Sequence, residues 1–159
     1  MPLTLRPFQS ADQLPVRRLI LEGLGEHFGF IDESFNPDLE NIETNYSLPG
    51  HYFVVAEKDG ELVGTGALIF QADDGAQMVR VSVAPKFRRQ GIARQIVEHL
   101  IQTARDRQVA HLWMETNQNW ASAIRLYQAC GFTEFKREDG LVYLRLEAAG
   151  FRDAYITDL

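Results

Sequence analysis

The 159-residue sequence contains a single cysteine, Cys130, and no hydrophobic run long enough to cross a bilayer. One cysteine excludes a framework of internal disulfides and is typical of proteins in a reducing compartment. The longest nearly apolar stretch, Leu62 to Phe70, falls short of the roughly 20 residues that a membrane helix needs. The first ten residues, MPLTLRPFQS, lack the basic and apolar regions of a secretory signal. We therefore expect a cytoplasmic protein with no membrane partner.

The sequence also lacks an even distribution of charge. Its net charge is −6, but residues 1–75 hold 4 Lys or Arg against 13 Asp or Glu, whereas residues 76–159 hold 12 against 9. An acidic half argues against a nucleic-acid partner, which is bound by a basic face. Within the second half, four basic residues lie close together with no acid among them, and this cluster predicts an anionic ligand. The four are Lys86, Arg88, Arg89 and Arg94.

Periodicity and turn signals predict a single mixed α/β domain with the order β-α-α-β-β-β-α-β-α-β-β. A hairpin signal at 58–60 and strict alternation over Val79–Val83 predict three consecutive antiparallel strands. Apolar pairs every four residues predict an amphipathic helix from Ile92 to about Arg107. The strands are expected at 3–6, 51–57, 61–70, 79–83, 112–114, 132–136 and 141–146. The helices are expected from a Ser10 cap to Leu24 (with Leu14 on its apolar face), over 37–46, 92–107 and 121–130, with a loop at 25–36.

The segment from Val83 to Ala93 joins a predicted strand to the long helix. A helix N-terminus presents free backbone N–H groups and a positive dipole end, so it binds phosphate readily. Gly91 and Ala93 are small enough for a phosphate to approach the backbone, and Arg88 and Arg89 add charge and forked donors. The segment has neither the P-loop nor the dinucleotide-binding pattern. On these residues alone, a tight turn with solvated arginines explains the pattern equally well.

Two motifs in this order resemble the GNAT superfamily of N-acetyltransferases. Arg88-x-x-Gly91-x-Ala93 matches the family signature R/Q-x-x-G-x-G/A, between a strand and an amphipathic helix. The stretch from Ala123 to Phe132 looks like the family helix A-I-x-L-Y-x-x-x-G-F. The resemblance covers about residues 3–147 and implies one GNAT-like domain, with a mostly antiparallel central sheet flanked by helices. Residues 148–159 would then form a C-terminal tail.

The resemblance implies acetyl-CoA as co-substrate. Val81 and Val83 match the positions that hold the pantetheine arm, on a strand that splays from its neighbour and leaves backbone groups unpaired. The N–H of Val81 would stabilise the developing oxyanion. Residues 88–93 would bind the pyrophosphate, through Arg88 and the backbone N–H groups of Arg89, Gly91, Ile92 and Ala93.

Tyr127 matches the family tyrosine that lies near the coenzyme sulfur and can protonate the leaving thiolate. A free phenol has a pKa near 10, close enough to that of a thiol for efficient proton transfer. Outside this motif, Tyr127 would be interpreted as a buried aromatic on the apolar stripe of its helix. Many family members have an asparagine that contacts pantetheine where this sequence has Trp120. Asn119 and Ser122 are the candidates to replace it.

The sequence does not single out a general base. Glu115 and Glu57 are candidates, although a glutamate in such a position is more often a solvated or ion-paired acid. Cys130 lies at a helix C-terminus, whose negative end raises a thiol pKa, so we expect a buried apolar residue rather than a nucleophile. The four histidines lack metal-ligand spacing, and we expect no metal site. An acidic cluster forms either a solvated face or an attraction for a cationic amine: Asp32, Glu33, Asp38, Glu40 and Glu43.

The predicted function is transfer of an acetyl group from acetyl-CoA to a primary amine by direct attack in a ternary complex. The acceptor can be a small molecule or a peptide, and the oligomeric state stays open, a homodimer included. One alternative is a non-catalytic acyl-CoA-binding or regulatory module on the same fold. Another is a protein N-terminus or lysine acetylase, which differs only in its acceptor.

Overall fold

The computed structural model describes residues 3–28 and 36–147, and in this part of the chain seven strands form one sheet. Their order across the sheet is β1-β2-β3-β4-β5-β7-β6. All neighbouring strands are antiparallel except β4 and β5, which confirms the mostly antiparallel central sheet. The strands are β1 (Thr4–Pro7), β2 (Tyr52–Lys58), β3 (Glu61–Phe70), β4 (Gly75–Val83), β5 (His111–Asn117), β6 (Thr133–Glu138) and β7 (Leu141–Glu147).

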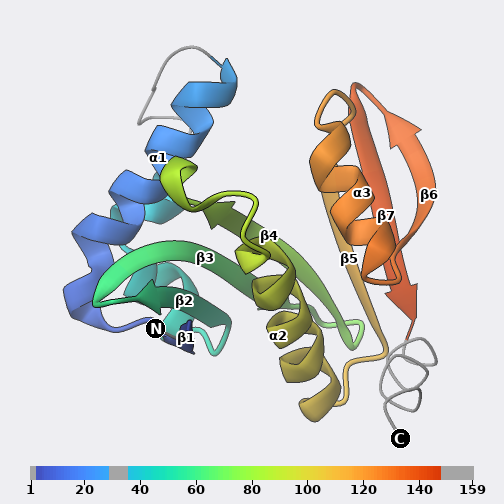
Figure 1. Ribbon diagram of the computed structural model, residues 1–159. Coiled ribbons are helices and arrows are strands. Elements are labelled where there is room, and N and C mark those ends of the chain that lie inside the picture. The colour runs from blue at the N-terminus through green and yellow to red at the C-terminus, as the bar shows by residue number, and fades with distance from the viewer. Residues whose placement is uncertain (1–2, 29–35, 148–159) are drawn as a thin grey trace, which may run out of the picture.

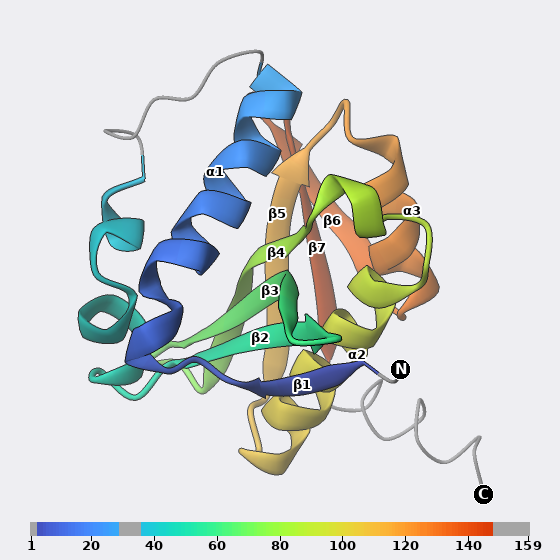
Figure 2. The same cartoon turned by 60° about the vertical axis from the view of Figure 1, so that its left-hand side comes forward.

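Helices cover both faces of the sheet (Figures 1 and 2). One core cluster packs α2 and α3 against one face, and a second packs α1, η3 and η4 against the other. Figure 1 shows α1 beside the β2–β4 half of the sheet and α3 beside β5 and β7. The helices are η1 (Ser10–Asp12), α1 (Gln13–Phe28), η3 (Pro37–Glu40), the π-helical turn η4 (Glu43–Ser47), η5 (Pro85–Phe87), α2 (Ile92–Asp106) and α3 (Ala121–Ala129). Among the described residues, none of these helices is both long and apolar enough to cross a bilayer.

Helix α2 forms as its sequence predicts, because its apolar pairs recur at helical spacing and face the sheet. The helix ends at Asp106, with Arg107 as its C-cap residue. It lies directly on β3, where a Cβ atom added at Gly64 or Gly66 would stand 2.7 Å from Ile96. Its buried side chains are Ile92, Ile96, Val97, Leu100, Ile101 and Ala104. The close packing fixes the start of α2 relative to the sheet.

The N-terminal helix differs from the prediction. Ser10 is not its cap: Gln9 takes the cap position of η1, and its N–H donates to the Asp12 carboxylate at 2.8 Å. Leu14 is 71% exposed, because it lies about 200° around the helix from the buried Val16. Helix α1 also continues to Phe28, so residues 25–28 are helical and not a loop. The remainder of the predicted loop, 29–35, and the predicted tail, 148–159, lie outside the described residues.

The single helix expected over 37–46 is two short turns, η3 and η4. Between them Asn41 has extended backbone, and its side-chain oxygen accepts the N–H of Thr44 at 3.0 Å. A local bond of this kind competes with helix continuation. The result is a compact segment, Asn36–Ser47, that packs beside α1 through Leu39, Ile42 and Tyr46.

Strand β4 begins at Gly75, earlier than predicted, and does not alternate strictly. Thr65 pairs with Ser82 and Ala67 with Val79, so Arg80 and Val81 both lie opposite the single residue Gly66. This two-against-one arrangement is a β-bulge, and Arg80 has a φ of +57°. Because of the bulge, Val79 packs with the α1 side, whereas Val81 and Val83 pack with the α2 side. The sequence pattern had placed all three valines on one face.

Candidate functional site

The candidate site lies where the central sheet opens. Parallel pairing of β4 with β5 extends only from Gly75–Gln77 to His111–Trp113, after which the strands part (Figure 1). A cavity of about 920 Å³ lies in the opening, with the loop before α2, the start of α3 and one side of α1 as its other walls. The open edge of β4 offers backbone donors and acceptors that β5 does not use. This is the splayed strand that the resemblance implied.

The loop before α2 has the backbone form of an anion site. Arg89 and Gly91 have left-handed conformations, with φ of +63° and +78°. The first helical hydrogen bond runs from Gln95 N to Gly91 O at 3.1 Å, so the N–H groups of Ile92, Ala93 and Arg94 have no partner within the helix. A Cβ atom at Gly91 would meet nothing within 4 Å. The turn is therefore open, and its amide groups are available to an anion.

The four basic residues near this loop divide into two groups. Arg88, Arg89 and Arg94 line the cavity, and the Arg88 Nε donates to Val83 O at 3.4 Å. Lys86 is not among the lining residues; it forms an exposed ion pair of 2.9 Å with Glu61. Arg94 pairs with Glu98 at 2.9 Å. The positive charge facing the cavity therefore comes from fewer side chains than the sequence cluster indicated.

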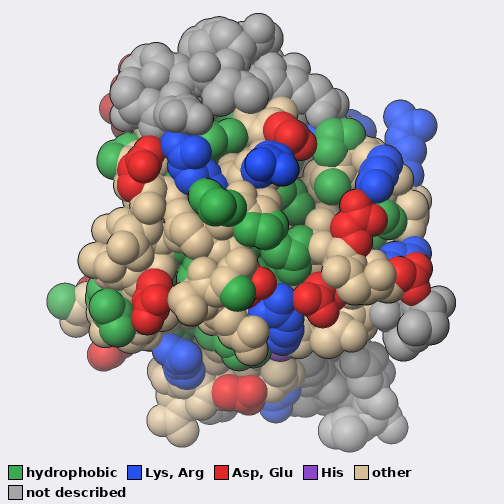
Figure 3. Space-filling model, turned by 90° about the vertical axis from the view of Figure 1, so that its left-hand side faces the viewer, with side chains coloured by type: hydrophobic (Ala, Val, Ile, Leu, Met, Phe, Trp, Pro, Cys, Tyr) green, Lys and Arg blue, Asp and Glu red, His purple; other side chains and the backbone are tan. Residues whose placement is uncertain are grey.

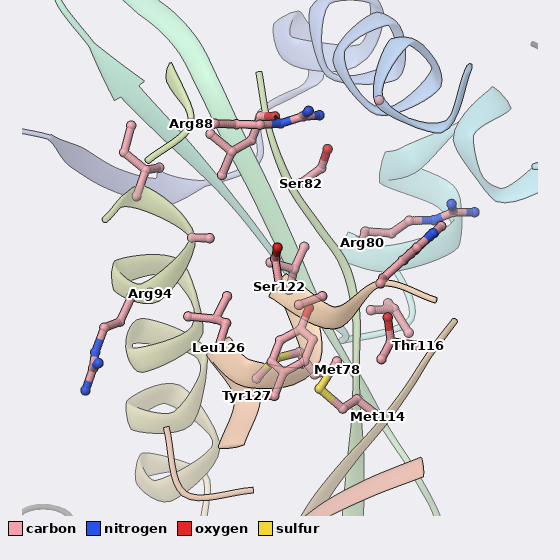
Figure 4. A pocket seen from close by; sticks show the side chains of 18 of the residues that line it. Met78, Arg80, Ser82, Arg88, Arg94, Met114, Thr116, Ser122, Leu126 and Tyr127 are labelled. Carbon is pink, nitrogen blue, oxygen red and sulfur yellow. Dashed lines mark hydrogen bonds between the residues drawn. The ribbon is translucent and has the colours of Figure 1, made fainter. Parts of the chain in front are cut away.

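Tyr127, on α3, is 6% exposed, and its hydroxyl points into the cavity (Figure 4). Its ring packs edge-on against Phe132 with the ring centroids 6.1 Å apart. Within the described parts of the chain no group hydrogen-bonds the hydroxyl. Burial, with a smaller contribution from Cys130, raises the pKa of Tyr127 above its ordinary value. The phenol is therefore protonated at neutral pH and free to donate to a ligand.

The cavity brings together the ten residues to which the family resemblance assigned acid catalysis or coenzyme binding. Asn119 and Ser122 are exposed at its rim, and the Asn117 side chain accepts the Asn119 N–H at 2.8 Å. Trp120, which stands in place of the family asparagine, also lines it, as the N-cap residue of α3. The ten predicted residues on the cavity are Val81, Val83, Arg88, Arg89, Gly91, Ile92, Ala93, Asn119, Ser122 and Tyr127.

Several lining residues were not found from the sequence. Ile20, Gly23 and Leu24 come from α1, and no motif signalled that this helix reaches the site. A second group lies on the two parted strands and was missed because the alternation pattern predicted which residues are on a strand but not that the strands separate. These residues are Met78, Arg80, Ser82, Met114 and Thr116, which Figure 4 shows around the cavity.

The two candidate general bases lie in different places. Glu115 on β5 is exposed and lines the cavity. Glu57 lies on β2, outside the lining, and accepts from Arg6 at 2.8 Å. Since Glu57 is ion-paired and outside the cavity, the structure removes it from consideration as a base for chemistry in this cavity.

The acidic cluster is largely ion-paired where the structure describes it. Arg80 contacts Asp38 at 2.6 Å and Arg17 contacts Glu40 at 3.0 Å, whereas Glu43 is exposed. Asp32 and Glu33, the other two members, lie outside the described residues. Figure 3 shows acidic and basic side chains interspersed over the described part of the face that carries α1. These ion pairs favour the interpretation of the cluster as a solvated, charge-balanced surface over its interpretation as a site that attracts cationic amines.

Cys130 is half-buried at the C-cap of α3 and packs against the α2-side core. Burial raises the pKa of its thiol, which is the opposite of what a nucleophilic cysteine needs. Among the described residues, no three His, Cys, Asp or Glu side chains gather closely enough to hold a metal ion.

Comparisons with known proteins agree on one family. The model of the acetyltransferase (GNAT) family matches residues 20–132. The [Ribosomal protein bS18]-alanine N-acetyltransferase of Escherichia coli K12 is 43% identical over 61 residues, 38% of this chain and 41% of that protein. This match therefore spans less than half of that relative's length.

Solved structures show the same fold. A GNAT-family acetyltransferase from Staphylococcus aureus Mu50 has a TM-score of 0.85 at 24% identity, over 92% of this chain and 99% of its own. The PaiA N-acetyltransferase from Thermoplasma acidophilum, solved in complex with coenzyme A, has a TM-score of 0.81 at 13% identity, over 92% and 99%.

Proposed function

The chain belongs to the acetyltransferase (GNAT) family, and on this basis we propose that it transfers an acetyl group from acetyl-CoA to a primary amine within a ternary complex. Residues 3–147 would form the catalytic domain. Acetyl-CoA is the co-substrate, and the proposed chemistry uses no metal. The single cysteine favours a reducing compartment, and we propose the cytoplasm. The observation that carries the proposal is the opening between β4 and β5, with an anion-type loop at one end and the Tyr127 hydroxyl inside it.

In this proposal the loop before α2 holds the coenzyme pyrophosphate. The left-handed residues Arg89 and Gly91 and the free amides at the start of α2 support this role. Arg88 lines the same end of the cavity and supplies positive charge. The β4 edge at Val81 and Val83 would pair with the peptide-like pantetheine arm, since β5 leaves those backbone groups unused.

The proposed reaction begins when the acceptor nitrogen attacks the thioester carbonyl carbon. The Val81 N–H stabilises the oxyanion that forms on the carbonyl oxygen. As the C–S bond breaks, the sulfur leaves as a thiolate and takes the proton of the Tyr127 hydroxyl. The amine loses its own proton to Glu115, which lines the cavity, or to an ordered water. The oxyanion collapses as the sulfur leaves, and the proton taken from the amine returns to the Tyr127 phenolate through solvent. The products are the acetylated amine and coenzyme A, and the enzyme regains its starting protonation state.

Calorimetry with coenzyme A and acetyl-CoA tests the binding part of the proposal. In the variant Ala93→Glu a negative charge stands at the start of α2, where it favours the helix dipole but repels a pyrophosphate. We expect the Kd for coenzyme A to rise by about 10-fold or more, from one close like-charge contact, while the melting temperature is maintained. Gln95→Glu adds the same charge to the same turn outside the cavity lining and is the matched control. Absence of binding heat for the wild-type chain, or equal affinity in Ala93→Glu, would contradict the proposal.

Free-thiol release from acetyl-CoA across a panel of amines tests the transfer. The panel includes small amines, lysine peptides and a peptide with an N-terminal alanine, because one relative is named for an alanine acceptor on a ribosomal protein. Amine-dependent thiol release is the expected result. Stabilisation by coenzyme A without thiol release for any amine would instead favour the non-catalytic binding module.

A further inference from the structure

We infer that Arg80 and Asp38 are positioning residues for acyl transfer: their ion pair holds the β4 bulge in the form that directs the Val81 N–H into the cavity. This inference rests on the proposed function. It concerns a side-chain network outside the residues assigned to coenzyme binding and acid catalysis. We call Arg80, Asp38, Asn36 and Tyr46 the Arg80 network.

The bulge is what lets Arg80 reach Asp38. In a regular strand successive side chains alternate between faces, so Arg80 would point away from the face that Val79 occupies. With the bulge, Val79 packs on the α1 side and Arg80 reaches the η3 turn on that same side. The bulged backbone is unfavourable by itself, because Arg80 has a φ of +57°. Something must therefore hold it.

The Arg80 guanidinium makes three hydrogen bonds. Its Nε and Nη2 donate to the two carboxylate oxygens of Asp38 at 3.0 and 2.6 Å, and its Nη1 donates to the Asn36 side-chain oxygen at 3.0 Å. Two parallel bonds to one carboxylate fix orientation as well as distance. The side chains of Arg80 and Asp38 are only 20% and 28% exposed. This pair is consequently less screened by solvent than a surface pair.

The core anchors the other end of the network. Tyr46 is 3% exposed, packs edge-on against Phe53 with centroids 5.1 Å apart, and donates its hydroxyl to Asp38 at 2.5 Å. The backbone of the bulge has its own anchor, because the fully buried Thr65 hydroxyl donates to the Arg80 carbonyl oxygen at 2.7 Å. The Arg80 residue is therefore held at its side chain and at its carbonyl.

The peptide that follows this anchored carbonyl carries the Val81 N–H. The Arg80 carbonyl and the Val81 N–H belong to one planar peptide unit, so fixing the oxygen fixes the direction of the N–H. Pairing with β5 has ended at Gln77, so β5 does not orient this peptide. Arg80 itself lines the cavity (Figure 4). Loss of the ion pair would remove the side-chain anchor and leave the bulge to the Thr65 bond, so the oxyanion donor would be less firmly placed while the proposed coenzyme loop, at residues 88–93, stays intact.

The test compares Arg80→Gln, Asp38→Asn and the double variant in thiol release with acetyl-CoA and the best amine of the panel. We expect each single variant to lower kcat by about 10- to 100-fold, the loss that a misplaced catalytic group produces. The double variant should lose no more than either single one, because the two residues act as one unit. The KM for acetyl-CoA and the Kd for coenzyme A should change less than about threefold, within the spread of independent sites.

The matched control is Glu40→Gln, which breaks the Arg17–Glu40 ion pair of the same η3 turn without touching Arg80. It should leave kcat unchanged. If the single variants fold poorly, Tyr46→Phe keeps the packed ring and removes only the hydrogen bond to Asp38. A purely structural role for the pair would lower the melting temperature and leave kcat per folded molecule at the wild-type value, and that result would overturn the inference. Additive losses in the double variant would also overturn it.

A second readout separates this inference from the proposed function. Amide hydrogen exchange at residues 79–82 should be faster in Asp38→Asn and unchanged in Glu40→Gln, whatever the enzyme activity. Equal exchange in Asp38→Asn and the wild type would refute the inference. An inactive wild-type chain with faster exchange in Asp38→Asn would refute the proposed function and retain the network as the element that holds the bulge.

Discussion

Among individual residues, the site depends most on Tyr127, whose hydroxyl stays protonated and faces the cavity. Tyr127 is almost fully buried, yet its hydroxyl faces the cavity without a partner in the described structure. Burial disfavours the phenolate, so the pKa of Tyr127 lies above its usual value. The hydroxyl therefore stays protonated and can donate to a departing thiolate, but it is a weaker acid than a free phenol.

We expect Tyr127→Phe to lower kcat by about 100- to 10,000-fold, the usual contribution of general acid catalysis, with the Kd for coenzyme A unchanged. Tyr52→Phe is the control. The Tyr52 hydroxyl hydrogen-bonds His99 at 2.7 Å, and Tyr52 is not among the residues that line the cavity. Steady-state kinetics and calorimetry measure the two quantities. Wild-type turnover in Tyr127→Phe would remove this residue from the acid role.

The pH dependence of the acid follows from the same burial. An acid is active while protonated, so its activity is lost only as the pH rises through its pKa. Because the pKa of Tyr127 is raised above the ordinary value of about 10, we expect no alkaline fall in kcat due to this residue below about pH 10. The assignment would be contradicted if kcat of the wild type decreased with a midpoint near pH 8 and this decrease were absent in Tyr127→Phe.

At the element scale, the position of α2 on β3 decides where the proposed coenzyme loop lies. The helix approaches the strand at two glycines that leave room for Ile96 and Leu100. Both side chains are fully buried, so they have little space to move aside. The loop at residues 88–91 continues directly into this helix. The packing of α2 on β3 therefore fixes the position of the loop's backbone N–H groups relative to the cavity.

Gly66→Ala tests this packing. The new methyl group would stand 2.7 Å from Ile96 Cγ2 and 2.9 Å from Leu100 Cδ1. We expect the free energy of unfolding to fall by about 1–3 kcal/mol, the usual cost of overpacking a core. Glu61→Ala, at an exposed position of the same strand, should change it by less than about 0.5 kcal/mol. Urea denaturation measures both values, and an unchanged midpoint for Gly66→Ala would show that α2 does not pack as tightly as described.

At the scale of the whole molecule, two partly buried arginines, Arg6 and Arg80, connect the α1 side to the sheet through three ion pairs. Arg6 bridges Asp12 and Glu57 at 2.8 Å each, and Arg80 binds Asp38 at 2.6 Å. The Arg6 bonds lower the pKa of Asp12 despite its burial. Burial would raise the pKa of Asp38, but the Arg80 and Tyr46 bonds outweigh it, and its pKa is lowered too.

These shifts give the sign of the pH dependence of stability. A carboxyl group whose pKa is lower in the folded state stabilises the fold above its unfolded pKa of about 3.9. That stabilisation is lost as the pH falls through the lower, folded-state pKa. Burial also lowers the pKa of His99, so the unfolded chain takes up this proton first and stability decreases as the pH falls below about 6.5. We expect this first decrease between about pH 7 and 5 and a second, steeper one below about pH 4, where the carboxyl groups are protonated. In urea unfolding, the free energy of unfolding of Asp12→Asn should decrease less steeply at acid pH than that of the wild type. Glu98→Gln, which removes an exposed ion pair, should retain the wild-type dependence on pH. The same dependence in all three proteins would exclude Asp12 as a source of the acid destabilisation.

Features that depend on consecutive residues could be predicted without the structure. Helix α2, the β2–β3 hairpin and the strand-to-helix loop are local patterns of periodicity, turn residues and small residues, and each formed as predicted. Tyr127 and the loop before α2, which the two motifs singled out, line one cavity. Local patterns suffice here because their hydrogen bonds are made within a few residues.

Features whose contacting residues lie far apart in the chain could not be predicted in this way. Arg80 meets Asp38 across 42 positions, so nothing near Arg80 in the sequence signals the bulge that reverses the expected alternation. Helix α1 reaches the cavity because it packs on β3 and β4, and Glu57 is removed from it by pairing with Arg6. The opening between β4 and β5 likewise results from how two strands diverge. Such features depend on the packing free energy of the whole fold, which short sequence patterns do not contain.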